Sequence, residues 1–192
     1  MKFYLVRHCS TSWKKFGYLS FTDLPLSEEG RREAREAANV LKQLEFERII
    51  TSPLSRARET AEIISEITAK EVSEDEGLKE VNFGIFEGLS RDEARERYPE
   101  IFEHREGDKW NFRIPKGESY SDALKRVSPL LSKIIKRGKP VVLVTHATMI
   151  KIIVKHLTNM PLEEIEKMRF KPGCVIEVRS RGKQWEIKVL NR

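Results

Sequence analysis

The stretch Phe3-Tyr4-Leu5-Val6-Arg7-His8-Cys9-Ser10-Thr11 determines how the rest of this 192-residue chain is interpreted. Its first four residues are apolar and lack a helical period, which is typical of a strand buried on both faces. Arg7 and His8 then stand at the carboxyl end of that strand, where open α/β sheets place their ligand crevices. A cation, an imidazole and neighbouring hydroxyl groups suit the binding of an anion and nucleophilic or acid–base chemistry on it.

A second stretch with the same design lies far along the chain. Val141-Val142-Leu143-Val144-Thr145-His146 is again an apolar run that ends in a histidine. One Arg-His pair after one strand is weak evidence, because such pairs are mostly surface residues or satisfied polar clusters. Since two of the four histidines close two such strands, the sequence favours one site that contains both.

The remaining pattern predicts a three-layer α/β/α fold with a mainly parallel central sheet. Segments with helical periods alternate with short apolar strands, as in α/β proteins. Ser52 is predicted to cap the second helix, with Pro53 at the first helical position. No linker, repeat or low-complexity segment interrupts the pattern, so we expect a single domain over residues 1–192.

Two further polar residues are candidates for the site. Arg56 lies in the first turn of the predicted second helix, where its guanidinium is placed to bind phosphate oxygens. Glu80 is the carboxylate best placed by loop character to act as an acid. Residues from about 82 to 118 are aromatic, charged and poorly periodic, which predicts an excursion that covers the site. Glu118 is expected to serve the start of the helix that follows.

Composition limits the partners that we expect. No run of about 18 apolar residues exists, so we expect no membrane-spanning segment. The net charge of +6 comes from basic residues interleaved with acids, which disfavours nucleic-acid binding and favours attraction of an anionic substrate. Two cysteines, Cys9 and Cys174, form no disulfide framework, so a reducing, cytoplasmic setting is the simplest expectation. A homodimer is left open.

The candidate residues suit phosphoryl transfer through a phosphohistidine. A neutral imidazole attacks phosphorus, arginines stabilise charge on the equatorial oxygens, and a carboxylic acid protonates the departing alkoxide. The sequence contains no metal-ligand spacing, no Gly-x-Ser-x-Gly elbow and no Walker loop. We therefore expect neither a metal nor a cofactor.

Six ordered motifs over nearly the whole chain resemble the histidine phosphatase superfamily, with its phosphoglycerate-mutase-like fold. They are Leu5-Val6-Arg7-His8, Leu26-Ser27-x-x-Gly30, Ser52-Pro53-Leu54-x-Arg56-Ala57-x-x-Thr60-Ala61, Glu80-x-x-Phe83-Gly84-x-x-Glu87-Gly88, Gly117-Glu118-Ser119 and Val144-Thr145-His146. By resemblance, His8 is the phosphorylated nucleophile and Glu80 stands at the proton-donor position. The same resemblance assigns Arg7, Arg56 and His146 to the transferring phosphoryl group.

Four positions depart from the family's usual pattern. Cys9 and Ser10 stand where the family usually has glycine and then glutamate or glutamine, and Ala147 replaces a glycine. Cys9 adds a side chain where backbone normally approaches phosphate. Lys14 replaces an asparagine and is a further candidate for binding the phosphate, with a solvent-facing position as the equal alternative.

The resemblance implies a phosphatase of a small phosphorylated metabolite. Mutases with this pattern are generally longer and enclose the site, so the compact chain favours hydrolysis. Segment 22–26 and the tail from Phe170-x-x-x-Cys174 through Val189-Leu190-Asn191 resemble α-ribazole phosphatases of cobalamin synthesis. This makes α-ribazole 5′-phosphate one candidate substrate. The alternatives are a cofactor-dependent phosphoglycerate mutase and a non-catalytic phosphate-binding module. The retained histidines and Glu80 disfavour the binding module, because binding alone needs only the arginines.

Overall fold

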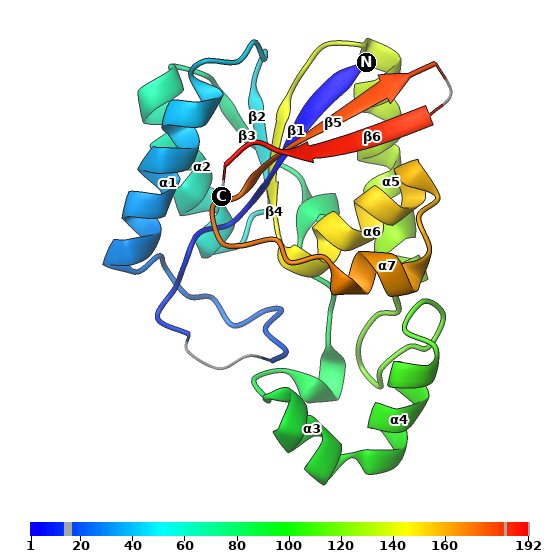
Figure 1. The fold of residues 1–192 in the computed structure, drawn as a ribbon. Helices are drawn as coiled ribbons and strands as arrows, with labels where there is room; N and C mark the ends of the chain where they lie inside the picture. The colour runs from blue at the N-terminus through cyan, green and yellow to red at the C-terminus, as the bar shows by residue number, and fades with distance from the viewer. Residues whose placement is uncertain (14–16, 183, 192) are drawn as a thin grey trace.

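The computed structural model describes residues 1–13, 17–182 and 184–191 (Figure 1). This part of the chain contains a six-stranded sheet with the order β3-β2-β4-β1-β5-β6. The neighbouring strands β3, β2, β4 and β1 run parallel, whereas β5 and β6 extend the sheet as an antiparallel hairpin. The strands are β1 (Lys2–Arg7), β2 (Ile49–Thr51), β3 (Val72–Glu74), β4 (Val142–Thr145), β5 (Val175–Arg181) and β6 (Gln184–Val189).

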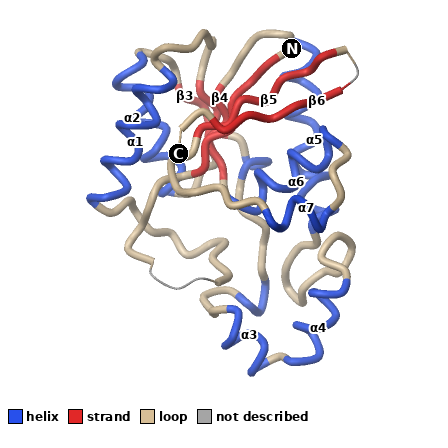
Figure 2. The backbone as a smooth tube through the Cα atoms, in the orientation of Figure 1, coloured by secondary structure: helices blue, strands red, loops and turns tan. Residues whose placement is uncertain are grey.

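Helices cover both faces of this sheet, as Figure 2 shows. On one face lie α1 (Glu28–Leu41) and α2 (Ser55–Thr68), and on the other lie α5 (Tyr120–Arg137) and α6 (Ala147–Thr158). The short helix α7 (Leu162–Lys167) packs on α6. The predicted three-layer α/β/α fold with a mainly parallel sheet is confirmed.

The packing of β1 explains why polar and apolar residues do not alternate in its sequence. Phe3 and Leu5 pack into the core under α5 and α6, whereas Tyr4 and Val6 pack under α1 and α2. All four side chains are fully buried. A central strand covered by helices on both faces must be apolar at every position, which is what the sequence shows.

The two strands that end in histidine are neighbours in the sheet. β1 pairs with β4 in parallel, with Arg7 opposite Thr145. The backbone N–H of His8 then donates to the Thr145 carbonyl at 2.8 Å. His8 and His146 therefore leave the same edge of the sheet side by side.

The predicted cap at Ser52 is wrong. The second helix, α2, begins at Ser55, and its N-cap residue Leu54 provides no side-chain hydrogen bond. The N–H of Ser52 donates to the Val144 carbonyl at 2.9 Å, so Ser52 still belongs to the sheet edge beside β4. Its hydroxyl lies 2.8 Å from Nε2 of His146, which makes it part of the site and not of a helix cap.

Residues 82–118 extend beyond the carboxyl edge of the parallel strands (Figure 1). They contain the 3₁₀ turn η2 (Gly84–Phe86) and the helices α3 (Arg91–Arg97) and α4 (Pro99–Gly107). Another 3₁₀ turn, η1 (Glu76–Leu78), lies just before this segment. A buried aromatic cluster attaches this segment to the rest of the molecule, with the Phe86 ring 5.0 Å from that of Tyr18. Among the described residues, no helix combines the length and apolar character needed to cross a membrane.

Candidate active site

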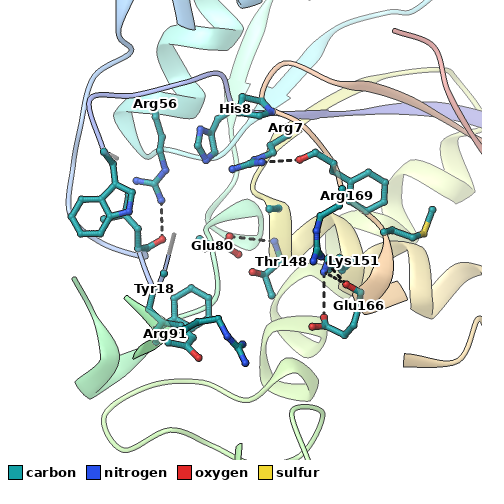
Figure 3. A pocket seen from close by; sticks show the side chains of 18 of the residues that line it. Arg7, His8, Tyr18, Arg56, Glu80, Arg91, Thr148, Lys151, Glu166 and Arg169 are labelled. Atoms are coloured by element: carbon teal, nitrogen blue, oxygen red, sulfur yellow. Dashed lines mark hydrogen bonds and ion pairs between the residues drawn. The ribbon is translucent and has the colours of Figure 1, made fainter. Parts of the chain in front are cut away.

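A cavity of about 910 Å³ opens at the carboxyl edge of the parallel strands (Figure 3). Arg7, His8, Arg56 and Glu80 line it. His146 is fully buried directly behind, with its ring centroid 5.1 Å from that of His8. Five of the six predicted site residues therefore lie together. The sixth, Lys14, lies outside the described residues.

His8 is held as a neutral imidazole with one free nitrogen. Its Nδ1 donates to the carbonyl of Cys9 at 2.8 Å, because a carbonyl oxygen can only accept. Nε2 then carries the lone pair, which is the form that a nucleophile needs. Burial, and next the charges of Arg56 and Arg7, hold the pKa of His8 well below its usual value.

His146 occupies the N-cap position of α6, and its Nε2 shares a hydrogen bond of 2.8 Å with the Ser52 hydroxyl. Its Nδ1 is buried and has no hydrogen-bond partner among the described residues. Burial and the nearby charge of Arg56 also hold the pKa of His146 well below its usual value. The site thus contains two uncharged imidazoles beside two arginines.

The two arginines are fixed by backbone carbonyls and keep donors free. Nη1 of Arg7 donates to the Phe170 carbonyl at 2.7 Å, and Nη2 of Arg56 donates to the Ser20 carbonyl at 3.0 Å. Nε of each arginine has no partner within the described part of the chain. Carbonyls hold a guanidinium without cancelling its charge, so both arginines remain available to an oxyanion.

The loop that holds Arg56 is itself held by Glu87. Its carboxylate accepts the backbone N–H groups of Ser20, Phe21 and Thr22 at 2.8, 3.0 and 3.0 Å. The carbonyls of Ser20 and Thr22 in turn accept from Arg56. Glu87 therefore positions Arg56 indirectly, through the backbone of this loop.

Glu80 lies at the cavity wall with its carboxyl group turned inward. One oxygen accepts the N–H of Val81 at 2.9 Å, and the other accepts the N–H of Thr148, in the first turn of α6, at 3.3 Å. Burial raises the pKa of Glu80 above its ordinary value, despite these two hydrogen bonds. A carboxyl group whose pKa is raised by burial suits the role of a proton donor.

The chain leading to Glu80 is fixed by Arg126 on α5. Its Nη1 donates to the carbonyls of Gly77 and Lys79 at 2.9 and 3.1 Å, and its Nε pairs with Glu118 at 3.0 Å. The expectation that Glu118 serves the helix start is wrong. Ser119 caps α5, whereas the Glu118 carboxylate, just before the helix, pairs with Arg126 and orients it.

The side chain of Cys9, in the loop that follows β1, points into the core. The thiol is fully buried among residues of α1 and α2. Burial raises the pKa of Cys9 to about 12, which keeps the thiol protonated. Glu33 on α1 accepts the N–H of Ser10 at 2.7 Å and its hydroxyl at 2.8 Å, so the substituted loop is firmly held.

Several cavity residues escape sequence reasoning. Tyr18, Arg91, Arg105, Lys109 and Lys151 all line the same cavity as His8. Lys151 had a usable signal, because it lies one helical turn after Ala147 in a helix that starts at the second histidine. Tyr18 and Lys109 lie outside helices and strands, and Arg91 and Arg105 lie in the short helices α3 and α4. No sequence pattern points these side chains toward the cavity.

The family follows from a comparison of the sequence with known proteins. A sequence model of the histidine phosphatase superfamily (branch 1) matches residues 3–192. The chain belongs to this superfamily. Its members are phosphatases or mutases, which agrees with the paired histidines, the arginines and the acid described above.

Curated relatives in the superfamily include both kinds of enzyme. The chain is 33% identical to a 2,3-bisphosphoglycerate-dependent phosphoglycerate mutase of Parvibaculum lavamentivorans, with 90% of this chain and 87% of the relative covered. It is 30% identical to the phosphatase PhoE of Bacillus subtilis, over 97% of this chain and 92% of that protein. A 6-phosphofructo-2-kinase/fructose-2,6-bisphosphatase of Arabidopsis thaliana is 31% identical over 81% of this chain, which spans 21% of that larger protein.

Solved structures share the fold over the whole chain. The α-ribazole phosphatase of Shigella flexneri has a TM-score of 0.85 at 23% identity and covers 100% of this chain, with 96% of its own chain matched. A mycobacterial glucosyl-3-phosphoglycerate phosphatase, solved with inorganic phosphate, has a TM-score of 0.84 at 25% identity, covering 100% and 97%. The superfamily member described here thus has a fold shared by phosphatases with different substrates.

Proposed function

We propose that this protein is a metal-independent phosphomonoesterase that forms a phosphohistidine on His8 and acts on a small phosphorylated metabolite. One observation carries the proposal. The neutral imidazole of His8 lines a cavity together with two arginines that backbone carbonyls hold, and with Glu80, whose pKa is raised by burial as an acid requires. No group of three or more potential metal-ligating side chains occurs among the described residues.

In the first half-reaction Nε2 of His8 attacks phosphorus and the bond to the ester oxygen breaks. Glu80 gives its proton to that oxygen, so the product leaves as a neutral alcohol. In the second half-reaction the Glu80 carboxylate takes a proton from water, which attacks the phosphohistidine. The phosphorus–nitrogen bond breaks, phosphate leaves, and neutral His8 and protonated Glu80 are restored.

Arg7, Arg56 and the α6 N-terminus stabilise charge on the transferring group in both steps. His146 begins α6, and its unpaired Nδ1 gives the site another polar contact for a phosphoryl oxygen. The first turn of α6 adds a favourable electrostatic field for an anion. Because these groups are already in place, little reorganisation is needed when negative charge develops.

Names of similar proteins suggest different substrates. The α-ribazole phosphatase structure supports α-ribazole 5′-phosphate only through a shared fold. The relatives named for bisphosphoglycerate, fructose 2,6-bisphosphate and glucosyl-3-phosphoglycerate point to compounds that carry a second acidic group. We propose a small-molecule substrate in the cytoplasm, without nucleic-acid or membrane partners. α-Ribazole 5′-phosphate stays a prediction within that class.

A phosphoglycerate mutase is the second candidate, because a mutase is 33% identical over most of both chains. The same phosphohistidine would then pass its phosphoryl group to an alcohol in place of water. Incubation with 3-phosphoglycerate separates the two functions by product: a phosphatase releases inorganic phosphate, whereas a mutase produces 2-phosphoglycerate. We expect phosphate.

The proposal is tested by phosphate release from α-ribazole phosphate, 3-phosphoglycerate, phosphoserine and an aryl phosphate in excess chelator. Wild type and His8→Ala are compared at matched concentrations. Chelator-resistant release that requires His8 is the expected result. Release that persists in His8→Ala, or that chelator abolishes, contradicts the proposal.

A further inference from the structure

The cavity has a second positively charged wall away from His8. Figure 3 shows Arg91 and Lys151 on opposite sides of the cavity, with Arg7 and Arg56 at its other end. Arg91 begins α3 and Lys151 lies on α6, so the wall is assembled from distant parts of the chain. We call the following four residues the distal wall: Arg91, Arg105, Lys109 and Lys151.

Two carboxylates hold the distal wall together. Glu106 lies 2.7 Å from Arg91, 2.8 Å from Arg105 and 3.3 Å from Lys109. Glu166 lies 3.1 Å from Lys109 and 3.6 Å from Lys151. Four cations against two carboxylates leave a surplus of two positive charges in this wall.

Other charged residues nearby do not remove that surplus. Lys167, Arg169 and Glu163 also line the cavity, and together they add one further positive charge. Nη1 of Arg169 donates to the backbone carbonyl of Glu166, which leaves its charge uncancelled. The cavity end opposite His8 is therefore positive among the described residues.

Three of the four cations of the distal wall are largely buried. The side chains of Lys109 and Lys151 are each 15% exposed, and that of Arg105 is 5% exposed. Burial lowers the pKa of Lys151. Removing cations from water is unfavourable unless enough anions surround them, and here there are too few. An anionic ligand would supply the missing partner.

A hydroxyl group on the same wall also lacks a partner. Tyr18 is 4% exposed, lines the cavity, and its hydroxyl has no hydrogen-bond partner among the described residues. The guanidinium of Arg105 lies 5.2 Å from the centre of the Tyr18 ring, which places this tyrosine at the distal wall. A buried hydroxyl without a partner is destabilising, so its presence here indicates a ligand oxygen.

We propose that the distal wall is a second anion subsite, and that the substrate carries a carboxylate or a second phosphate on its departing alcohol. This inference rests on the proposed phosphatase function and names its substrate class. A cavity of about 910 Å³ holds a molecule of sugar-phosphate size, with its reacting phosphate at His8 and its second anion at the distal wall. α-Ribazole 5′-phosphate, whose alcohol is neutral, is then a poor substrate.

Two matched pairs of phosphate esters test the subsite. The first pair is 3-phosphoglycerate and glycerol 3-phosphate, which differ by a carboxylate. The second is fructose 1,6-bisphosphate and fructose 6-phosphate, which differ by a phosphate. We expect kcat/KM of wild type to favour the doubly anionic member of at least one pair by about tenfold or more, as charge-assisted hydrogen bonds allow. The pair that shows the preference identifies the second anion.

Two variants, Lys109→Met and Lys151→Met, should reduce that preference at least about fivefold. Lys155→Met is the matched control, because it changes the same residue type on the same helix as Lys151. Lys155 lies over the Trp110 ring, 4.5 Å from its centre, and is not among the residues that line the cavity. It should leave the ratio as in wild type. Thermal unfolding of each variant establishes that it is folded.

Binding to His8→Ala separates failure of the subsite from failure of the phosphatase proposal. Calorimetric titration with 3-phosphoglycerate, glycerol 3-phosphate and both fructose phosphates measures the preference without turnover. A binding preference without phosphate release from wild type would refute the phosphatase function and keep the subsite. Equal kcat/KM and equal affinity within both pairs, or a preference that survives both lysine substitutions, would overturn the subsite.

Discussion

The two ends of the cavity are built in different ways, and the difference separates reaction from recognition. At the catalytic end, Arg7, His8 and His146 stand at the ends of β1 and β4, and Arg56 lies in the first turn of α2. At the distal end, three of the four cations come from residues 91–109, outside the sheet, and the fourth from α6. In the proposed function, the rigid sheet edge fixes the groups that make and break bonds, and the excursion supplies groups that select the alcohol.

The charges at the two ends are also held differently. Backbone carbonyls hold Arg7 and Arg56, so their positive charge stays available to the strongly anionic phosphoryl group. Carboxylates hold the distal cations, which cancels half of the charge of that wall. The phosphoryl group at His8 carries more negative charge during transfer than the second anion of the substrate at the distal wall. The larger free positive charge at the catalytic end matches this difference.

The largest expected effect on activity comes from a substitution at the catalytic end alone. His8→Ala removes the nucleophile and should lower kcat by at least about 10⁴-fold for every substrate, with or without a second anion. Steady-state phosphate release measures it, with the thermal unfolding midpoint as the control for folding. Residual activity above about one tenth of wild type would rule out covalent catalysis, since only about 1.4 kcal/mol of transition-state stabilisation would be lost.

Removal of the acid sharpens the assignment of Glu80. Glu80→Gln should lower kcat by about 10²-fold or more for alkyl phosphates, because the departing alkoxide needs a proton. For nitrophenyl phosphate the loss should stay below about tenfold, since this leaving group is stable as an anion. The two kcat values are compared in one buffer. Equal losses on both substrates would place the acid elsewhere.

Glu87 tests whether the two ends of the cavity have separate roles. It lies within residues 82–118, yet it holds the loop whose carbonyls fix Arg56. Glu87→Gln should therefore lower kcat/KM about tenfold for singly and doubly anionic substrates alike, leaving the preference ratio unchanged. A selective loss on doubly anionic substrates would instead assign Glu87 to the distal wall.

The smallest effect concerns stability and pH. The pKa of His8 and of His146 lies well below 6.5 in the folded protein, so in acid the unfolded chain binds protons that the folded chain does not. The free energy of unfolding should therefore rise with pH up to about 6.5 and level off, by up to about 1.4 kcal/mol per pH unit for each histidine. The raised pKa of Glu80 acts in the opposite direction.

Urea denaturation between about pH 5 and 7.5 measures this slope. His8→Ala keeps His146 and Glu80, so it should lose one histidine's share of the rise. A slope identical to that of wild type would show that His8 titrates normally in the folded protein.

Much of the fold was readable from the sequence because local patterns dictated it. The apolar runs before His8 and His146 could only be central strands, and two parallel strands of one sheet bring their carboxyl ends together. Arg56 was placed by its position in the first turn of a helix that follows a strand. In each case a short-range pattern determined where a backbone element ends.

The rest depended on long-range contacts that no local pattern encodes. The local sequence at Ser52 is typical of a helix cap. In the structure its backbone N–H instead pairs with the Val144 carbonyl of β4, and its hydroxyl lies beside His146. Arg105 and Lys109 lie in a stretch whose sequence is charged and poorly periodic, so no local pattern places their side chains. Only the fold of residues 82–118 over the sheet edge turned them toward the cavity. Lys14 lies outside the described residues, and its role stays a prediction.

Trapping the phosphoenzyme tests the central claim most directly. Wild type is mixed with nitrophenyl phosphate, quenched within milliseconds in alkali, where phosphohistidine persists, and digested for mass spectrometry. The account predicts one phosphoryl group on the peptide that contains His8, formed in wild type and absent from His8→Ala and from unreacted protein. Full turnover with an unmodified His8, or a phosphoryl group on another residue, would contradict it.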